Sequence, residues 1–339
     1  MGLVGVVLSS SPEDRRLVRP REVPWAPGTR RVGGRCDCGL QVGERYGGSN
    51  HDHRWAGQTV AMAASLPTDV RRILQDHGLR PSRALGQNFL SDPNTARRIA
   101  RLAGVGPGDA VVEVGAGLGS LTVALASTGA MVTAIETDRH LVPILRERVE
   151  PLGVAVVHAD ATAVRWPDVL AGSPRWVLVA NLPYNVAVPI VLRVLDEAPM
   201  VERLLVMVQR EVAERLAAPA GSRVYGSVSV HVAYWGEAAV VGRVPATVFV
   251  PRPNVESALV VIERRPRPAV DPDVVGAERL FSVVRAGFGQ RRKMLRRSLA
   301  GVVDPSAFAA VGVAPDARAE ELDVVAWGRL AAWCPTTST

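Results

Sequence analysis

The feature that most constrains the fold of this 339-residue chain is a series of short apolar segments that alternate with segments of helical periodicity. Strands that are apolar along their whole length are buried on both faces, and strands that alternate with helices pair in parallel. The pattern predicts an α/β fold with a mostly parallel, doubly wound sheet. The segments expected to form strands are residues 110–114, 131–135, 154–158, 176–180 and 204–208.

Four residues that could bind a ligand have the same kind of position, because each comes at the end of a predicted strand. They are Gly115, Glu136, Asp160 and Asn181. In open parallel sheets the ligand binds at the carboxyl ends of the strands. We therefore expect a ligand site where these four residues meet.

Residues 113–119 read Glu-Val-Gly-Ala-Gly-Leu-Gly, and Gly115 and Gly117 allow a tight turn that brings the backbone close to a ligand. Glu136 follows about twenty residues later, which is the spacing at which an acid accepts from ribose hydroxyls. Dinucleotide enzymes use G-x-G-x-x-G, with a helix N-terminus facing a pyrophosphate. The spacing here is G-x-G-x-G, and it favours S-adenosylmethionine, which has no phosphate, over a dinucleotide.

Asp160 has two interpretations at this stage. Its carboxylate can accept from the adenine amine of the cofactor, or it can cap the N-terminus of a helix.

The segment Asn181-Leu182-Pro183-Tyr184 follows the fourth predicted strand. These residues suit methyl transfer to the exocyclic N6 of an adenine. That nitrogen is a poor nucleophile, because its lone pair is delocalised into the ring. The side-chain oxygen of Asn181 and the carbonyl of Leu182 can each accept one N–H and so free that lone pair for attack. Pro183 stiffens the turn, and Tyr184 offers a ring on which an extruded base can stack. The alternative is a plain turn with a core tyrosine.

A second candidate for contact with the base lies in residues 249–257, which form an extended, proline-containing segment. Phe249 can clamp the other face of the target adenine, or it can anchor this loop in the core.

Together these motifs resemble the ribosomal RNA adenine dimethyltransferase family. The resemblance spans roughly residues 66–333, and its closest match is to bacterial members that modify two adjacent adenosines near the 3′ end of 16S rRNA. Beyond the segments already described, it includes residues 85–90 (Leu-Gly-Gln-Asn-Phe-Leu), 287–295 and 318–322.

The resemblance implies a class I, Rossmann-like methyltransferase fold with a small helical C-terminal domain. It also implies that Asn88 and Leu90 help to hold S-adenosylmethionine, and that each adenine receives two methyl groups in succession.

The expected organisation is an extension over residues 1–61, a methyltransferase domain over 62–265, and a helical, RNA-contacting domain over 273–335. Residues 1–61 are rich in Gly, Pro, Arg and Ser and have no sustained period, which predicts disorder. Met62 begins a segment that reads as a fresh start, so translation is expected to begin at or near it. Residues 227–234 fit either a strand or, by the resemblance, a helix. Residues 259–262 are expected to form an antiparallel edge strand.

The extension holds four residues of metal-ligand type, which are Cys36, Cys38, His51 and His53. Their C-x-C and H-x-H spacing is not that of a standard zinc site, so we expect no metal.

The chain has a formal net charge of +7, and Lys293 is its only lysine. Basic proteins are favoured near polyanions, and arginine adds bidentate phosphate contacts. We expect contacts with RNA phosphates from a basic segment, defined here as residues 285–297, although a solvated helix face is the alternative. Its cations are Arg285, Arg291, Arg292, Lys293, Arg296 and Arg297.

The expected partner is 16S rRNA or the immature small ribosomal subunit, and the protein is expected to be a cytoplasmic monomer without a membrane segment. Three alternatives stay open. One is a large-subunit (23S) rRNA methyltransferase that confers antibiotic resistance, and another is a DNA adenine methyltransferase, for which no added target-recognition domain is evident. The third is a ribosome-assembly factor whose catalysis is secondary.

Overall fold

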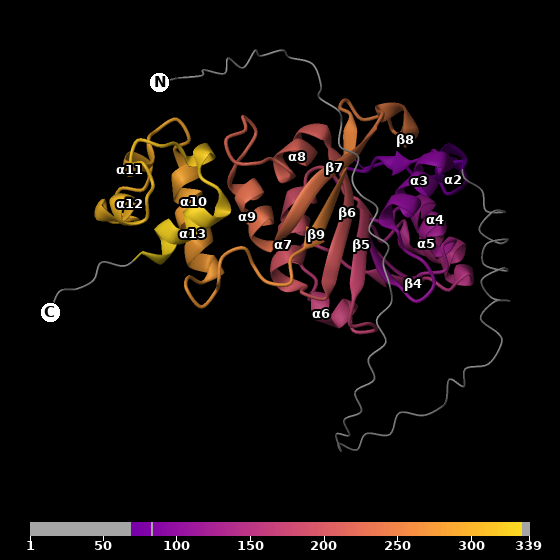
Figure 1. Ribbon diagram of the computed structural model, residues 1–339. Coiled ribbons are helices and arrows are strands. Elements are labelled where there is room, and N and C mark those ends of the chain that lie inside the picture. The colour runs from indigo at the N-terminus through magenta and orange to yellow at the C-terminus, as the bar shows by residue number, and fades with distance from the viewer. Residues whose placement is uncertain (1–68, 83, 334–339) are drawn as a thin grey trace, which may run out of the picture. The chain divides into compact units, whose positions relative to one another are not determined.

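This computed structural model describes residues 69–82 and 84–333 (Figure 1). Its central element is a seven-stranded sheet with the order β4-β3-β2-β5-β6-β9-β7. The first five strands in that order are parallel, as the sequence predicted, and β9 is antiparallel to both of its neighbours. The strands are β2 (Ala110–Val114), β3 (Met131–Glu136), β4 (Ala155–His158), β5 (Trp176–Asn181), β6 (Val201–Gln209), β7 (Gly236–Val244) and β9 (Ser257–Arg264).

The expectation that residues 259–262 form the edge of the sheet is wrong. Strand β9 is antiparallel, but β7 pairs with its outer side and forms the edge. Strand β7 has no clear signature in the sequence, because Val240 and Val241 are 43% and 38% exposed and the register shifts between Val240 and Gly242.

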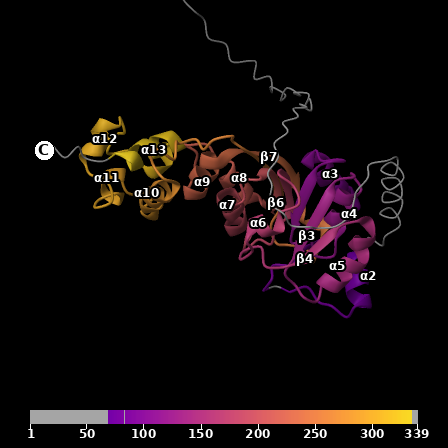
Figure 2. The same ribbon diagram turned by 90° about the horizontal axis from the view of Figure 1, so that it is seen from below.

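Alternate strand residues enter two separate cores, as period-two side chains of a doubly covered sheet must. Val111 and Leu205 lie in one core, and Val112 and Leu204 lie in the other. Figure 2 shows α4 and α5 on one side of the strands and α6 and α7 on the other. The helices on the first side are α3 (Pro93–Ala103), α4 (Ser120–Ala126) and α5 (Val142–Val149), the last followed by a 3-10 turn, η1 (Glu150–Leu152). The helices on the second side are α6 (Trp166–Val169), α7 (Ala187–Glu197) and α8 (Arg210–Leu216).

Helix α2 (Val70–Asp76) buries Val70, Ile73 and Leu74. Asp92 caps α3 and is followed by Pro93 in the first turn. The segment between these helices contains strand β1 (Phe89–Leu90). This strand pairs with β8 (Phe249–Val250), which follows the 3-10 turn η2 (Ala246–Val248).

Residues 227–234 are helical and belong to α9 (Ser227–Trp235), as the family resemblance suggested. Val232 of α9 packs in the core of the sheet, whereas Val230 and Tyr234 pack in a third core with the C-terminal helices. The C-terminal elements are α10 (Ala277–Gly289), α11 (Leu295–Ser298), α12 (Ser306–Ala310), η3 (Ala319–Glu321) and α13 (Val324–Ala332).

The expectations for residues 1–61, for Met62 and for the four residues of metal-ligand type fall outside the described residues. Within the described residues, no helix is long and apolar enough to cross a membrane.

Candidate active site

A cavity opens at the carboxyl ends of β2, β3 and β5, where the shared strand ends placed the expected site. Three segments form its walls: residues 85–90, the glycine turn after β2, and the turn after β5. The predicted site residues that line it are Asn88, Leu90, Gly115, Gly117, Glu136, Asn181, Leu182, Pro183 and Tyr184.

The glycine turn lies close to both of the other walls. Gly115 and Gly117 have φ angles of 72° and 57°, a region that disfavours residues with a Cβ. A Cβ at Gly117 would lie 3.1 Å from the ring of Phe89, and a Cβ at Gly115 would lie 3.5 Å from Pro183. Conformation therefore favours glycine at both positions, and at Gly117 the close ring of Phe89 disfavours a side chain as well.

The buried carboxylate of Glu136 organises two backbone turns. Its Oε2 accepts from the N–H of Gly117 at 2.7 Å, and its Oε1 accepts from those of Thr137 and Asp138 at 3.0 and 2.9 Å. Burial raises the pKa of Glu136, and these three hydrogen bonds oppose that rise. A carboxylate has about four acceptor positions, so Oε2 keeps one for a ligand.

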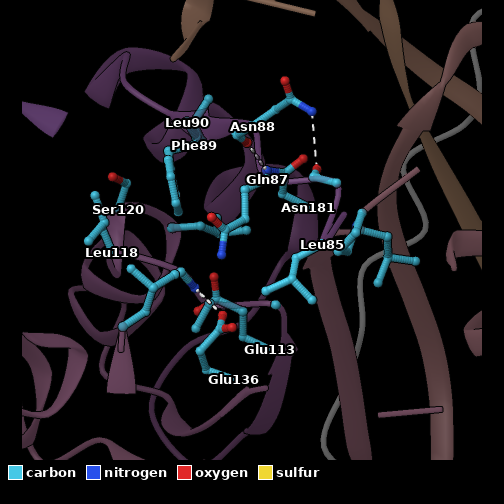
Figure 3. A pocket seen from close by; sticks show the side chains of 18 of the residues that line it. Leu85, Gln87, Asn88, Phe89, Leu90, Glu113, Leu118, Ser120, Glu136 and Asn181 are labelled. Carbon is cyan, nitrogen blue, oxygen red and sulfur yellow. Dashed lines mark hydrogen bonds between the residues drawn. The ribbon is translucent and has the colours of Figure 1, made fainter. Parts of the chain in front are cut away.

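Glu113 lines the cavity beside Glu136, although its sequence context predicted no role for it (Figure 3). Its side chain is 1% exposed, and burial, together with the charge of Glu136, raises its pKa to about 8. Its Oε2 has no hydrogen-bond partner among the described residues. The signal that could have found it is its place directly before the glycine turn.

The side chain of Asn181 is held from the opposite wall of the cavity (Figure 3). Its Nδ2 donates to the backbone carbonyl of Asn88 at 3.1 Å, which leaves Oδ1 as an acceptor. The N–H of Leu182 donates to the carbonyl of Met207 in β6, while the carbonyl of Leu182 accepts from no backbone group of the described chain. Two acceptors, Oδ1 of Asn181 and the carbonyl of Leu182, therefore stand one residue apart.

Tyr184 is fixed by Ser257, a residue for which the sequence predicted no role. The Tyr184 hydroxyl lies 2.8 Å from the hydroxyl of Ser257, which is fully buried at the start of β9. Burial raises the pKa of Tyr184. The contact ties the turn after β5 to the end of the segment that begins at Phe249.

A second contact that the sequence did not predict joins the 85–90 segment to the turn after β3. Gln87 donates from Nε2 to Asp138 at 2.7 Å, and its Oε1 accepts from the N–H of Ser82 at 2.7 Å. Because Asp138 also donates its N–H to Glu136, the 85–90 segment and the turn after β3 form one hydrogen-bonded unit.

Two predicted residues do not line the cavity. Asp160 is exposed, and its Oδ1 accepts from both the N–H and the hydroxyl of Thr162, which stabilises a turn over residues 161–163; the next helix, α6, begins only at Trp166. Phe249 is 3% exposed and packs in the core with Leu90 and Leu259. This packing agrees with the loop-anchor alternative, and contact of the Phe249 ring with a target base stays a prediction.

The six cations of the basic segment are all exposed. Arg291 differs from the rest, because its Nη2 donates to the carbonyl of Arg223 at 2.7 Å and its Nε lies 3.6 Å from Oε2 of Glu320. The other five make no ion pair within residues 69–82 and 84–333.

The sequence model of the family described as ribosomal RNA adenine dimethylase matches residues 79–334. A protein from Streptomyces avermitilis named ribosomal RNA small subunit methyltransferase A is 48% identical over 278 residues, covering 78% of this chain and 92% of the relative. A protein of the same name from Nocardia farcinica is 48% identical over 277 residues, covering 78% and 94%.

Among solved structures, the 23S rRNA methyltransferase ErmE superposes with a TM-score of 0.57 at 29% identity, covering 72% of this chain and 98% of that one. A dimethyladenosine transferase from Plasmodium falciparum superposes with a TM-score of 0.60 at 21% identity, covering 71% and 95%. The fold is thus that of class I methyltransferases, with a helical C-terminal region. The extent of the sequence match and the high identity to the relatives establish that this chain belongs to the ribosomal RNA adenine dimethylase family.

Proposed function

We propose that this protein transfers methyl groups from S-adenosylmethionine to N6 of two adjacent adenosines near the 3′ end of 16S rRNA during maturation of the small subunit. The observation that carries this proposal is the pair of acceptors formed by Asn181 and Leu182 at the rim of a glycine-lined cavity.

The chemistry of the cavity fits S-adenosylmethionine. The carboxylate of Glu136 lines it, Glu113 beside it holds a proton below about pH 8, and the described residues around it include no Arg, Lys or His. Such a site suits a cationic ligand better than a pyrophosphate. The free acceptor position on Oε2 of Glu136 suits a ribose hydroxyl. Gly117 has no side chain, so its backbone is accessible to a ligand.

Other residues complete the proposed cofactor site. The 85–90 segment, with Asn88 and Leu90, forms the wall opposite the glycine turn. Asp160 uses only Oδ1 for Thr162, so its Oδ2 stays available to accept from the adenine amine of the cofactor.

When bound, the cofactor supplies an activated methyl group on a sulfonium, so no strong base is needed. Oδ1 of Asn181 and the carbonyl of Leu182 each accept one N–H of the target N6. These bonds favour a pyramidal nitrogen whose lone pair points at the methyl group. Stabilisation by fixed acceptors of this kind is the largest catalytic contribution in many enzymes.

The second transfer asks less of the same groups. A monomethylated N6 keeps one N–H, so one acceptor suffices and the other must tolerate a methyl group. Tyr184 offers its ring to the extruded base, and its contact with Ser257 holds that ring in place.

The C-terminal helices are proposed to contact RNA through Arg285, Arg292, Lys293, Arg296 and Arg297, which carry exposed charge without ion pairs in the described chain. Contacts of this kind position the enzyme rather than read sequence. We also propose the division into a methyltransferase domain over 62–265 and a helical domain over 273–335, and a cytoplasmic, monomeric protein.

The test is primer extension across the 3′ end of 16S rRNA from a strain in which the encoding gene is deleted, with and without the purified enzyme. Primer extension should stop at two adjacent adenosines only after treatment. Methylation of 23S rRNA in the same assay, with 16S rRNA unchanged, would overturn the proposal in favour of the large-subunit alternative.

An assembly role is separated by Asn181→Ala. We expect Asn181→Ala to abolish methylation and to cause any subunit-assembly defect at the same time. If assembly survives this substitution while methylation is lost, binding has a function of its own.

A further inference from the structure

The loop between α8 and α9, residues 217–226, is held unusually firmly for a segment that exposes its side chains. Gly221 donates its N–H to the carbonyl of Glu320 at 2.7 Å, and Arg291 donates to the carbonyl of Arg223. Tyr225 is 2% exposed, and its ring meets that of Phe288 edge-on at 6.0 Å. Figure 1 shows this loop next to the C-terminal helices.

The loop exposes one cation, Arg223, that can contact a polyanion. The side chain of Arg223 is exposed and makes no ion pair within the described residues, and Val224 beside it is 39% exposed. The loop follows α8, which begins where β6 ends, and β6 pairs with β5 up to Asn181. The hydrogen bonds of Gly221 and Arg223 join this loop to Glu320 and to Arg291 of the basic segment.

Arg291 is already committed within the protein. Its guanidinium contacts the Arg223 carbonyl and Glu320, whose Oε2 is buried. A charge neutralised by a nearby carboxylate contributes little to phosphate binding. The same guanidinium therefore connects two segments. It contacts Arg223 in the loop and Glu320 in η3.

From these contacts we infer that the 217–226 loop is a pre-organised rRNA-contacting element that presents Arg223 to backbone phosphates. Arg291 is the positioning residue that locks it to the C-terminal helices. The inference rests on the proposed function and adds a contact region to it. A rigid loop binds with less loss of conformational entropy, which is the physical reason for such a lock.

The test measures binding of the full chain to small ribosomal subunits that lack the two dimethyladenosines, over a range of salt concentrations. Arg223→Ala should reduce the slope of log K against log salt by about one unit, as loss of one phosphate contact does. The matched control is Arg101→Ala, which removes another exposed arginine without an ion pair among the described residues, located on α3. If Arg223→Ala binds like this control, the loop is not a contact.

Glu320→Gln separates a lock from a simple phosphate contact. The substitution adds one unit of net positive charge, so binding should tighten if Arg291 is a phosphate ligand. The lock predicts weaker binding instead, and it predicts that Arg223→Ala adds little in the Glu320→Gln background. Tighter binding by Glu320→Gln overturns the assignment of Arg291. These binding results are interpreted only if the wild-type protein methylates 16S rRNA. If the wild-type protein lacks that activity, the proposed function has failed instead.

Discussion

The side-chain amide of Asn181 is anchored across the cavity by its 3.1 Å hydrogen bond to the carbonyl of Asn88. Only the amino end of an amide can donate to a carbonyl, so this contact decides which end of Asn181 is offered to a substrate. The 85–90 segment thereby orients a residue that lies 93 positions later in the chain.

Asn181→Asp tests this orientation. The new carboxylate places an acceptor against the Asn88 carbonyl, so the side chain must turn away, and we expect kcat for rRNA methylation to fall about 100-fold or more. Single-turnover methylation of 16S rRNA measures the effect. Asn185→Asp makes the same change in charge four residues later, outside the cavity lining, and should retain most activity. Comparable losses in both variants would contradict the orientation argument.

A double-mutant cycle tests the contact between Tyr184 and Ser257. Ser257→Ala removes a hydrogen bond of about 1 kcal/mol, so kcat/KM for rRNA should fall about fivefold. If Ser257 acts through the Tyr184 hydroxyl, the same substitution should have no further effect in a Tyr184→Phe background. Independent losses in the cycle would show that Ser257 acts on packing alone. Affinity for S-adenosylmethionine, measured by calorimetry, should not change in either variant.

Gly117→Ala should lower both the affinity for S-adenosylmethionine and the stability of the fold, because the new methyl group lies against Phe89 at a positive φ. Gly153 is a matched control, since its φ is 80° and a Cβ added there would have no neighbour within 4 Å among the described residues. Gly153→Ala should cost about 1 kcal/mol of stability and leave cofactor affinity unchanged. Equal affinities for the two variants would argue against close backbone approach to the cofactor.

Glu113 makes stability depend on pH. Its pKa is about 8 when folded, against an ordinary 4.5, so between these values the folded state holds a proton that the unfolded state has released. The free energy of unfolding should therefore fall as pH rises from about 4.5 to about 8, and this contribution should then level off.

Glu113→Gln removes this dependence. The difference in Tm between the variant and the wild type should grow in favour of the variant up to about pH 8. Glu278→Gln, at an exposed position on α10, is the control and should follow the wild type at every pH. A constant difference across this range would mean that Glu113 is ionised in the folded protein.

The sequence predicted the parallel strands and the site at their ends, because buried strands are continuous apolar runs and because glycines and polar residues punctuate their ends. Gly115, Glu136 and Asn181 were found by this rule alone. It failed for β7, whose residues are half exposed and lack such a run.

What the sequence could not predict are contacts between segments far apart in the chain. Gln87 with Asp138 and Tyr184 with Ser257 are separated by 51 and 73 residues, and no local pattern links them. Phe249 had two open interpretations for the same reason. Its pairing with Leu90 across β1 and β8 is a property of the fold.

The division of α9 between two cores has a consequence for chimeric enzymes. Its Val232 faces the sheet, while Val230 and Tyr234 serve the C-terminal helices. If residues 273–335 alone were exchanged between relatives, the foreign helices would have to pack against the native Val230 and Tyr234 of α9. A graft that preserves this packing must therefore carry the α9 surface along with the C-terminal helices.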